Sequence, residues 1–283
     1  MKNKLSAAAA AAFTLTFSSL AFAQVGQSSD NFSRLSRPPP PPTAQLSPQA
    51  TVEAAKQRVA ADKKAGRVPD RKTLQMLLSA QSQLKDEAGM ADTLEEEAAD
   101  YNDPADWSEI IAITFSTPGL RDQDQIWLGR LLFVVGAQVP PTDASTVGQI
   151  ASQHGFFGDA VNAKAHGGQV DPDPTPHADS DKKTMPDQIA QEQAQDGAYN
   201  AKLAEALYGY GMYPQAEAAA KLAIQKGGNP DPSEAPMVLG QALTAEGKYD
   251  DAVVAFGQVS GGGPVTPRIA RLWADYAKIK KRH

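Results

Sequence analysis

The sequence repeats itself near its C-terminal end, and this periodicity limits the folds open to the chain more than any other feature. The segment AKLAEALYGYGMYPQAEAAAKLA, from Ala201, aligns with MVLGQALTAEGKYDDAVVAFGQV, from Met237, at an offset of 36 residues. Repeats of roughly 20 to 50 residues are typical of proteins that stack one small helical or mixed unit. The matching positions are Leu203 with Leu239, Ala204 with Gly240, Ala206 with Ala242, Leu207 with Leu243, Gly211 with Gly247, Tyr213 with Tyr249, Ala216 with Ala252 and Ala219 with Ala255.

A third, weaker copy precedes these two at an offset of 56 residues from the first of them. Its matching positions are Gly148 with Ala204, Gly155 with Gly211, Phe157 with Tyr213 and Ala160 with Ala216. The offset of 56 exceeds the offset of 36 by 20 residues, which is close to the length of the acidic, proline-rich segment 169–185. We therefore interpret that segment as an insertion between two repeats of one array.

The repeated positions suit a hairpin of two helices. In the last copy the small residues Gly240 and Ala252 belong where the two helices cross most closely. Gly247 supplies the positive backbone angle that ends the first helix. We expect Tyr249 to pack between this hairpin and the next, and Phe256 to be the bulky residue of the second helix.

This pattern resembles the tetratricopeptide repeat family. The copy at 233–259 matches best, although Pro236 stands where the family has an early tryptophan. The resemblance assigns packing roles in the two best copies to Ala204, Gly211, Tyr213, Ala216, Gly240, Gly247, Tyr249, Ala252 and Phe256.

The other copies fit the family less closely. The copy at 197–228 has Ala220 where the family has a bulky residue, and the copy at 144–168 is shorter. Residues 70–136 fit only loosely, with Met90 and Leu94 at the family's alanine and aromatic positions.

The resemblance implies an all-α fold, a right-handed solenoid of tetratricopeptide-like helical hairpins. It also implies a concave groove that binds a peptide or a partner protein and is lined by first-helix residues facing away from the second helix. Here these residues are Lys202, Glu205, Tyr208, Met237, Gln241 and Thr244. Their spacing of three and four places each set on one helical stripe. The last helix, RIARLWADYAKIKKR, has no second helix after it, and we interpret it as a terminal cap.

Residues 1–23 have the features of a signal peptide. Lys2 and Lys4 precede an apolar stretch, and Ala21-Phe22-Ala23 offers small residues at the cleavage positions. We expect cleavage after Ala23 and export to the periplasm or the medium, with no integral membrane segment left afterwards. A retained anchor is the alternative, but the apolar stretch is short for a membrane span.

Prolines divide the rest of the chain into four predicted parts. Residues 24–46 contain five consecutive prolines and are expected to form a disordered leader, because proline joins neither helices nor sheets readily. Residues 47–168 are predicted to be an N-terminal region of helical hairpins. Residues 169–185 are a predicted acidic linker, and 186–283 hold the C-terminal repeats with their capping helix.

Helix signals follow one another within residues 47–136. Ser47-Pro48 and Asp103-Pro104 are typical helix starts, and Asp70 predicts another. The sequence IWLGRLLFVV, from Ile126, is apolar on most sides but contains Arg130 and is too short to span a bilayer. It predicts the most deeply buried helix.

Patterns typical of catalysis and metal binding are missing from the sequence. There is no cysteine, which excludes disulfides, thiolate metal sites and a cysteine nucleophile. The four histidines lack metal-ligand spacing, and neither a serine elbow nor a phosphate-binding loop is present. The linker holds Asp171, Asp173 and His177, but prolines replace the glycine turn that a calcium loop needs. We expect no metal, no cofactor and no enzymatic activity.

The charge of the mature chain narrows the range of partners. Cleavage would remove Lys2 and Lys4 and no acidic residue, which leaves 25 basic against 33 acidic residues. Such a chain is a poor candidate for binding nucleic acid or anionic membranes. The sequence thus predicts an exported scaffold for protein–protein interaction. A structural or assembly component of the cell envelope is the alternative.

Overall fold

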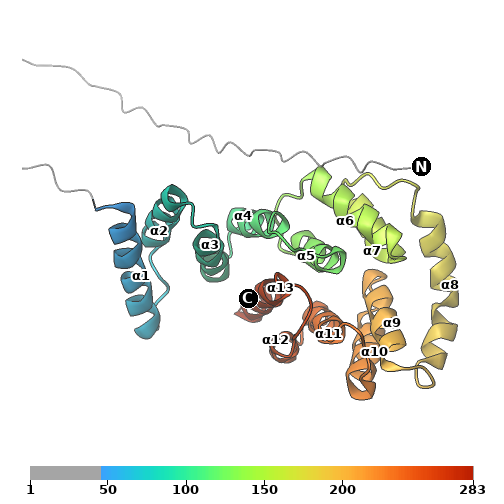
Figure 1. Ribbon diagram of the computed structural model, residues 1–283. Coiled ribbons are helices and arrows are strands. Elements are labelled where there is room, and N and C mark those ends of the chain that lie inside the picture. The colour runs from blue at the N-terminus through green and yellow to red at the C-terminus, as the bar shows by residue number, and fades with distance from the viewer. Residues whose placement is uncertain (1–45, 283) are drawn as a thin grey trace, which may run out of the picture. The chain divides into compact units, whose positions relative to one another are not determined.

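The computed structural model describes residues 46–282, and all regular structure within them is helical, without a strand (Figure 1). The helices are α1 (Pro48–Lys64), α2 (Arg71–Leu84), α3 (Glu87–Tyr101), α4 (Pro104–Phe115), α5 (Asp122–Val134), α6 (Pro141–Gln153), α7 (Phe157–Ala165), α8 (Thr175–Gln191), α9 (Gly197–Gly209), α10 (Tyr213–Lys226), α11 (Glu234–Ala245), α12 (Tyr249–Gly257) and α13 (Thr266–Arg282). The all-α prediction is confirmed for these residues. The predicted signal peptide and all of the predicted leader except Leu46 lie outside them.

Local sequence signals explain where several helices begin. The Ser47 hydroxyl accepts a hydrogen bond from the Ala50 amide at 3.2 Å, and the Asp103 carboxylate accepts one from the Ala105 amide at 2.9 Å. A proline follows each cap, at the position where a missing N–H costs nothing. Asp70 precedes α2 in an extended conformation, but its side chain makes no capping bond, contrary to the prediction.

Three hairpins share one turn geometry. Gly155, Gly211 and Gly247 lie between the paired helices α6 and α7, α9 and α10, and α11 and α12, with φ of 77°, 74° and 76°. After each glycine, the next amide donates to the carbonyl five residues earlier: Phe156 to Ala151, Met212 to Leu207 and Lys248 to Leu243. The three turns are therefore the same structure, at the offsets of 56 and 36 seen in the sequence.

Small residues bring the helices of these hairpins close together. Ala204, Ala216 and Ala252 have no exposed surface. A Cβ added at Gly240 would lie 2.5 Å from the Phe256 ring, so the ring fills the space that the glycine leaves. The aligned position in the earlier copy, Gly148, lies equally close to its neighbours, since a Cβ there would be 2.4 Å from Val170.

The prediction of a linker over 169–185 is wrong for its second part. Residues 175–185 belong to α8, a helix that continues to Gln191. Pro176 occupies the first turn, where proline is tolerated, and the buried side chains of Ala178 and Met185, seven residues apart, fall on one stripe. Asp181 also accepts a hydrogen bond from the Tyr210 hydroxyl at 2.9 Å, so this helix is attached to the neighbouring hairpin.

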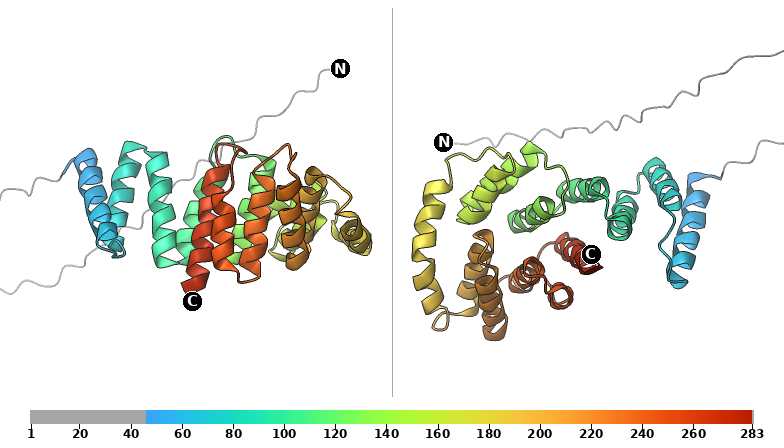
Figure 2. Two further views of the ribbon diagram at one scale, coloured as in Figure 1. Left: turned by 90° about the horizontal axis from the view of Figure 1, so that it is seen from below. Right: turned by 180° about the vertical axis from the view of Figure 1, so that it is seen from behind.

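Helices α9, α11 and α13 form one layer, because α11 packs against both α9 and α13. The helices α10 and α12 cover the outer side of this layer, and α5 lies on its opposite side (Figure 1). In Figure 2 the red and orange helices at the C-terminal end stand side by side. Helix α3 also packs against α13, which joins the first and last parts of the described chain.

Helix α11 is the most enclosed of the described helices, with every residue from Glu234 to Thr244 buried, so the prediction that gave this place to α5 is wrong. Helix α5 is nonetheless buried along its middle. Every residue from Ile126 to Leu132 is buried. The helix packs against α4, α6, α7 and α13, and its side chains reach α9 and α11. It is the element that places the candidate site.

Candidate functional site

Helix α5 covers the face on which the sequence predicted a partner-binding groove. Three of the predicted residues (Lys202, Glu205 and Tyr208) lie on α9, and the other three (Met237, Gln241 and Thr244) lie on α11. Five of the six are buried, and only Lys202 is exposed. This face is therefore filled by a helix of the same chain, and the prediction of an open groove there is wrong for the described conformation.

Arg130 of α5 holds this face through a set of buried polar contacts that we name the charge cluster: Arg130, Asp159, Glu205 and Gln241. Its guanidinium donates to both carboxylate oxygens of Asp159, at 2.8 and 2.7 Å. It also donates to Glu205 Oε2 at 2.5 Å and to Gln241 Oε1 at 2.8 Å. Helices α5, α7, α9 and α11 thus meet at one arginine.

Aromatic side chains complete the contact of α5 with the layer. The Trp127 indole N–H donates to Glu205 Oε1 at 2.7 Å, and the Trp273 indole N–H donates to the Trp127 carbonyl at 3.0 Å. The ring of Tyr208 lies 4.4 Å from the Arg130 guanidinium, close enough for a cation–π interaction. Both carboxylate oxygens of Glu205 are therefore used inside the protein.

The charge cluster holds one cation and two carboxylates, so it carries excess negative charge. Burial by itself would lower the pKa of Arg130, but the carboxylates of Asp159 and Glu205 raise it above its usual value and the guanidinium stays charged. Burial raises the pKa of Glu205 to about 7, because desolvation outweighs the attraction of Arg130. The neighbouring carboxylates of Glu234 and Asp159 shift this pKa in the same direction.

Sequence reasoning placed Arg130 in a buried helix but assigned it no role. The signal was present, because an arginine inside an apolar helix has to be paired when it is buried. The partners of Arg130 could not be identified from the sequence, because Asp159, Glu205 and Gln241 lie 29, 75 and 111 residues away along the chain.

The raised pKa of Glu205 predicts an unusual pH dependence of stability. The folded value of about 7 exceeds the ordinary value of 4.5, so the folded state holds the proton more tightly than the unfolded state. The contribution of this group is fully present below pH 4.5 and is lost as the pH rises through 7. We expect the melting temperature of the wild type to fall more steeply than that of Glu205→Gln between about pH 5 and about pH 8. Parallel melting curves for the two proteins would contradict this assignment.

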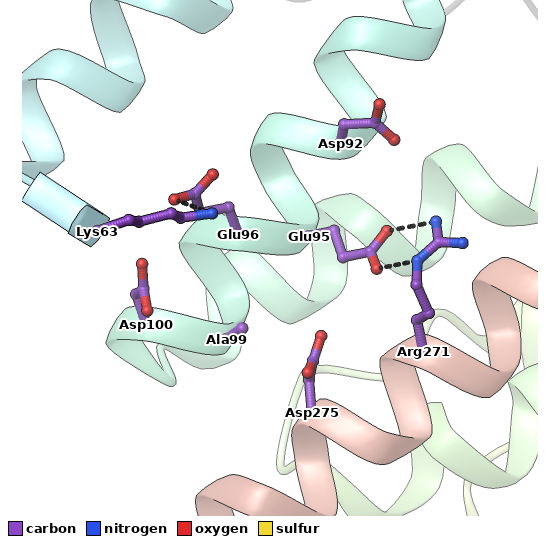
Figure 3. A pocket seen from close by; sticks show the side chains of 8 residues that line it. All are labelled: Lys63, Asp92, Glu95, Glu96, Ala99, Asp100, Arg271 and Asp275. Carbon is purple, nitrogen blue, oxygen red and sulfur yellow. Dashed lines mark hydrogen bonds and ion pairs between the residues drawn. The ribbon is translucent and has the colours of Figure 1, made fainter. Parts of the chain in front are cut away.

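A second feature is an open depression between α1, α3 and α13, of about 520 Å³ (Figure 3). Five carboxylates line it, and we name it the acidic hollow: Asp92, Glu95, Glu96 and Asp100 from α3, and Asp275 from α13. Its cations are Lys63, 2.7 Å from Glu96, and Arg271, whose guanidinium donates to both Glu95 oxygens at 2.8 and 3.1 Å. Carboxylates therefore outnumber cations among the lining residues.

Cations outside the lining neutralise two more of these carboxylates, since Arg268 lies 2.6 Å from Asp92 and Lys278 lies 2.8 Å from Asp275. Asp100 is the lining carboxylate without an ion pair among the described residues. Burial raises the pKa of the Asp100 carboxyl, and Lys63 and Arg282 offset this only in part. One of its oxygens, Oδ2, is buried without a hydrogen-bond partner among the described residues. The hollow thus offers one unpaired carboxylate, at Asp100, beside the contact of α3 with α13.

Residues 46–282 also bear on metal binding and on membrane crossing. Nowhere in that range do three histidine or carboxylate side chains gather closely enough to hold a metal ion. None of the described helices combines the length and the apolar character that a membrane crossing requires.

Comparison with known proteins adds no relationship. No protein-family model matches the chain, and no curated protein matches it. The candidate surfaces therefore stand on the geometry of this chain alone.

Proposed function

We propose that this protein is an exported scaffold of tetratricopeptide-like hairpins that binds a partner protein and catalyses no reaction. The observation that carries the proposal is the shared turn of the three hairpins, with Gly155, Gly211 and Gly247 in the same positive-φ conformation. Stacked identical hairpins form solenoids, and solenoids serve mainly as extended binding surfaces. The family assignment rests on this geometry and on the spacing of the repeated residues.

We assign the partner contact to the acidic hollow and not to the inner face of α9 and α11. The inner face is unsuited because removing α5 would expose Trp127, Leu128 and Leu131, each fully buried. Exposing each of these side chains would cost about 1.5–3 kcal/mol. The cost for all three together approaches the whole free energy of unfolding of a domain. The acidic hollow is open, and the unpaired Asp100 carboxylate favours a partner segment with lysine or arginine.

A site-specific crosslinking experiment tests this assignment. A photoreactive amino acid at Ala99, which lines the hollow, should form a covalent product with one protein in the native envelope fraction, identified by mass spectrometry. The matched control is the same group at Lys183, an exposed position of α8. Addition of salt should reduce the Ala99 product, because exposed charges are screened at high ionic strength. Equal products at both positions, or no product at Ala99, would count against the assignment.

Export is tested separately from binding. We expect the mature protein to begin at Gln24, because Ala21-Phe22-Ala23 provides the small residues that a signal peptidase requires. N-terminal sequencing of material from outside the cytoplasm checks this. Recovery of the chain with an intact Met1 from a membrane fraction would show that the N-terminal segment is retained.

A further inference from the structure

Beside the charge cluster lies a second cavity, of about 340 Å³, which we name the tyrosine slot. Tyr208, Tyr210 and Tyr213 line it, together with Asn162 of α7 and with Ala178 and Lys182 of α8. Its volume lies in the range of small-molecule sites, which is about 300–1,000 Å³. The segment predicted to be a solvated linker thus supplies one wall of this cavity.

One polar group in the tyrosine slot is buried and has no partner. The Tyr208 side chain is only 8% exposed, yet its hydroxyl makes no hydrogen bond within residues 46–282. The hydroxyl is not among the unpaired polar atoms that are sealed from solvent, so it reaches the space of the slot. Burial raises the pKa of Tyr208, which keeps this hydroxyl protonated and able to donate. Because the hydroxyl reaches the slot and has no protein partner, an acceptor bound there can receive its hydrogen bond.

The remaining unpaired polar groups of the slot can all donate a hydrogen bond. The hydroxyl of Tyr213, the side-chain amide of Asn162 and the ammonium of Lys182 have no hydrogen-bond or ion-pair partner within the described range. Lys182 Nζ lies 5.6 Å from the ring centre of Tyr210, at the side of the slot that α8 forms. Two nearby carboxylates are already engaged, because both oxygens of Asp159 bind Arg130 and Asp181 Oδ2 binds the Tyr210 hydroxyl.

The walls of the slot are apolar and aromatic between these donors. The rings of Tyr208 and Tyr213 lie 5.3 Å apart at an angle of 55°, and Val161 and Ala178 add aliphatic surface. Aromatic pairs prefer such offset and tilted arrangements, so a third ring can pack against them.

These features select one ligand chemistry. We propose that the tyrosine slot binds a monocarboxylate with an apolar, aromatic body, held by the Tyr208 hydroxyl and the Lys182 ammonium. Neutral sugars are less suitable, because they carry no charge to match the Lys182 ammonium. A doubly charged phosphate is also disfavoured, since Lys182 is the one cation of the slot whose charge is not already matched by described carboxylates.

The carboxylate can belong to a free acid or to the C-terminus of a peptide, and calorimetry on the full chain distinguishes the two. The probes are phenylacetate and its neutral amide phenylacetamide, and the tripeptide Ala-Ala-Phe with a free or an amidated C-terminus. We expect at least one acid to bind with 1:1 stoichiometry and about tenfold tighter than its amide, because a charge-assisted hydrogen bond is lost in the amide. Binding of phenylacetate alone identifies a free acid, and binding of the tripeptide alone identifies a chain terminus.

Two variants test the residues. Tyr208→Phe removes only the hydroxyl and keeps the ring over Arg130, and it should weaken acid binding about fivefold to tenfold. Lys182→Gln, on an exposed part of α8, should weaken it by about the same factor. The matched controls, Tyr199→Phe on the same helix and Lys183→Gln beside Lys182, should bind like the wild type, since neither residue lines the slot.

Either of two binding results would contradict the inference. If neither acid binds the wild type, or if Tyr208→Phe and Lys182→Gln both bind as tightly as the wild type, the inference is wrong. Lys182→Gln keeps the test valid even if Tyr208→Phe changes the melting temperature. The slot shares no residue with the acidic hollow, so this inference and the proposed scaffold function can fail independently.

Discussion

Replacement of Arg130 by methionine is expected to destabilise the protein by about 3–5 kcal/mol, because it leaves two buried carboxylates without their cation. Arg130 is 2% exposed, and Asp159 and Glu205 are 3% and 0% exposed. Methionine has a similar length and fills most of the space, so the loss reports the missing charge more than a cavity. Chemical denaturation followed by circular dichroism measures the change.

Two companions give this experiment its controls. Arg67→Met removes an exposed arginine paired with Asp62 and should change stability by less than about 1 kcal/mol. The triple variant Arg130→Met, Asp159→Asn, Glu205→Gln removes all three charges together and should recover part of the loss. A single Arg130→Met variant as stable as the wild type would show that the charge cluster does not hold α5 in place.

Gly197→Ala is the second change with a large expected effect, a loss of about 3 kcal/mol. Gly197 is the first residue of α9, and a Cβ there would lie 2.0 Å from the carbonyl oxygen of Gly227 and 3.0 Å from that of Ala223. Both contacts are with backbone, so no side chain can rotate away and α9 has to separate from the end of α10. The free energy of unfolding from urea titration measures the effect.

Gly257→Ala is the matched control. Gly257 is also a terminal helical residue, but nothing lies within 4 Å of the position that its Cβ would take. The free energy of unfolding of Gly257→Ala should stay within about 0.5 kcal/mol of the wild-type value, because alanine is at least as good a helix residue as glycine. If the two variants lost equal amounts of stability, the close approach of α9 to α10 would not be the reason that position 197 requires glycine.

The hairpins were predictable because their signals are local. Gly211 and Gly247 each follow a helix, four residues after Leu207 and Leu243, whose carbonyls accept the hydrogen bond that closes each hairpin turn. Small residues recur at fixed distances from the two glycines. The placement of α5 was not predictable in the same way. Its apolar character showed that it is buried, but the choice of the α9 and α11 face depends on polar contacts 75 or more residues away.

The candidate sites show the same division. The six predicted groove residues lie on α9 and α11, and the structure brings two of them, Glu205 and Gln241, together at Arg130. What failed was the assumption that all six face solvent. The tyrosine slot was missed because α8 was taken for a linker: its prolines fall at Pro174 and Pro176, at the start of a helix, and at Pro186 inside it. A stripe of only Ala178 and Met185 is too sparse to register as helical periodicity.

The position of α5 has a consequence for the order of folding. Repeat proteins ordinarily gain structure unit by unit, since each unit touches only its neighbours. Here the Trp127 carbonyl accepts a hydrogen bond from the Trp273 indole, which lies 146 residues downstream. The Trp127 indole in turn donates to the Glu205 carboxylate, 78 residues downstream. Loop closure over such distances slows folding, and the side of α5 that faces α9, α11 and α13 stays exposed until nearly the whole chain has been made. A chain that stops before α13 would therefore be prone to aggregate, even though most of its hairpins are complete.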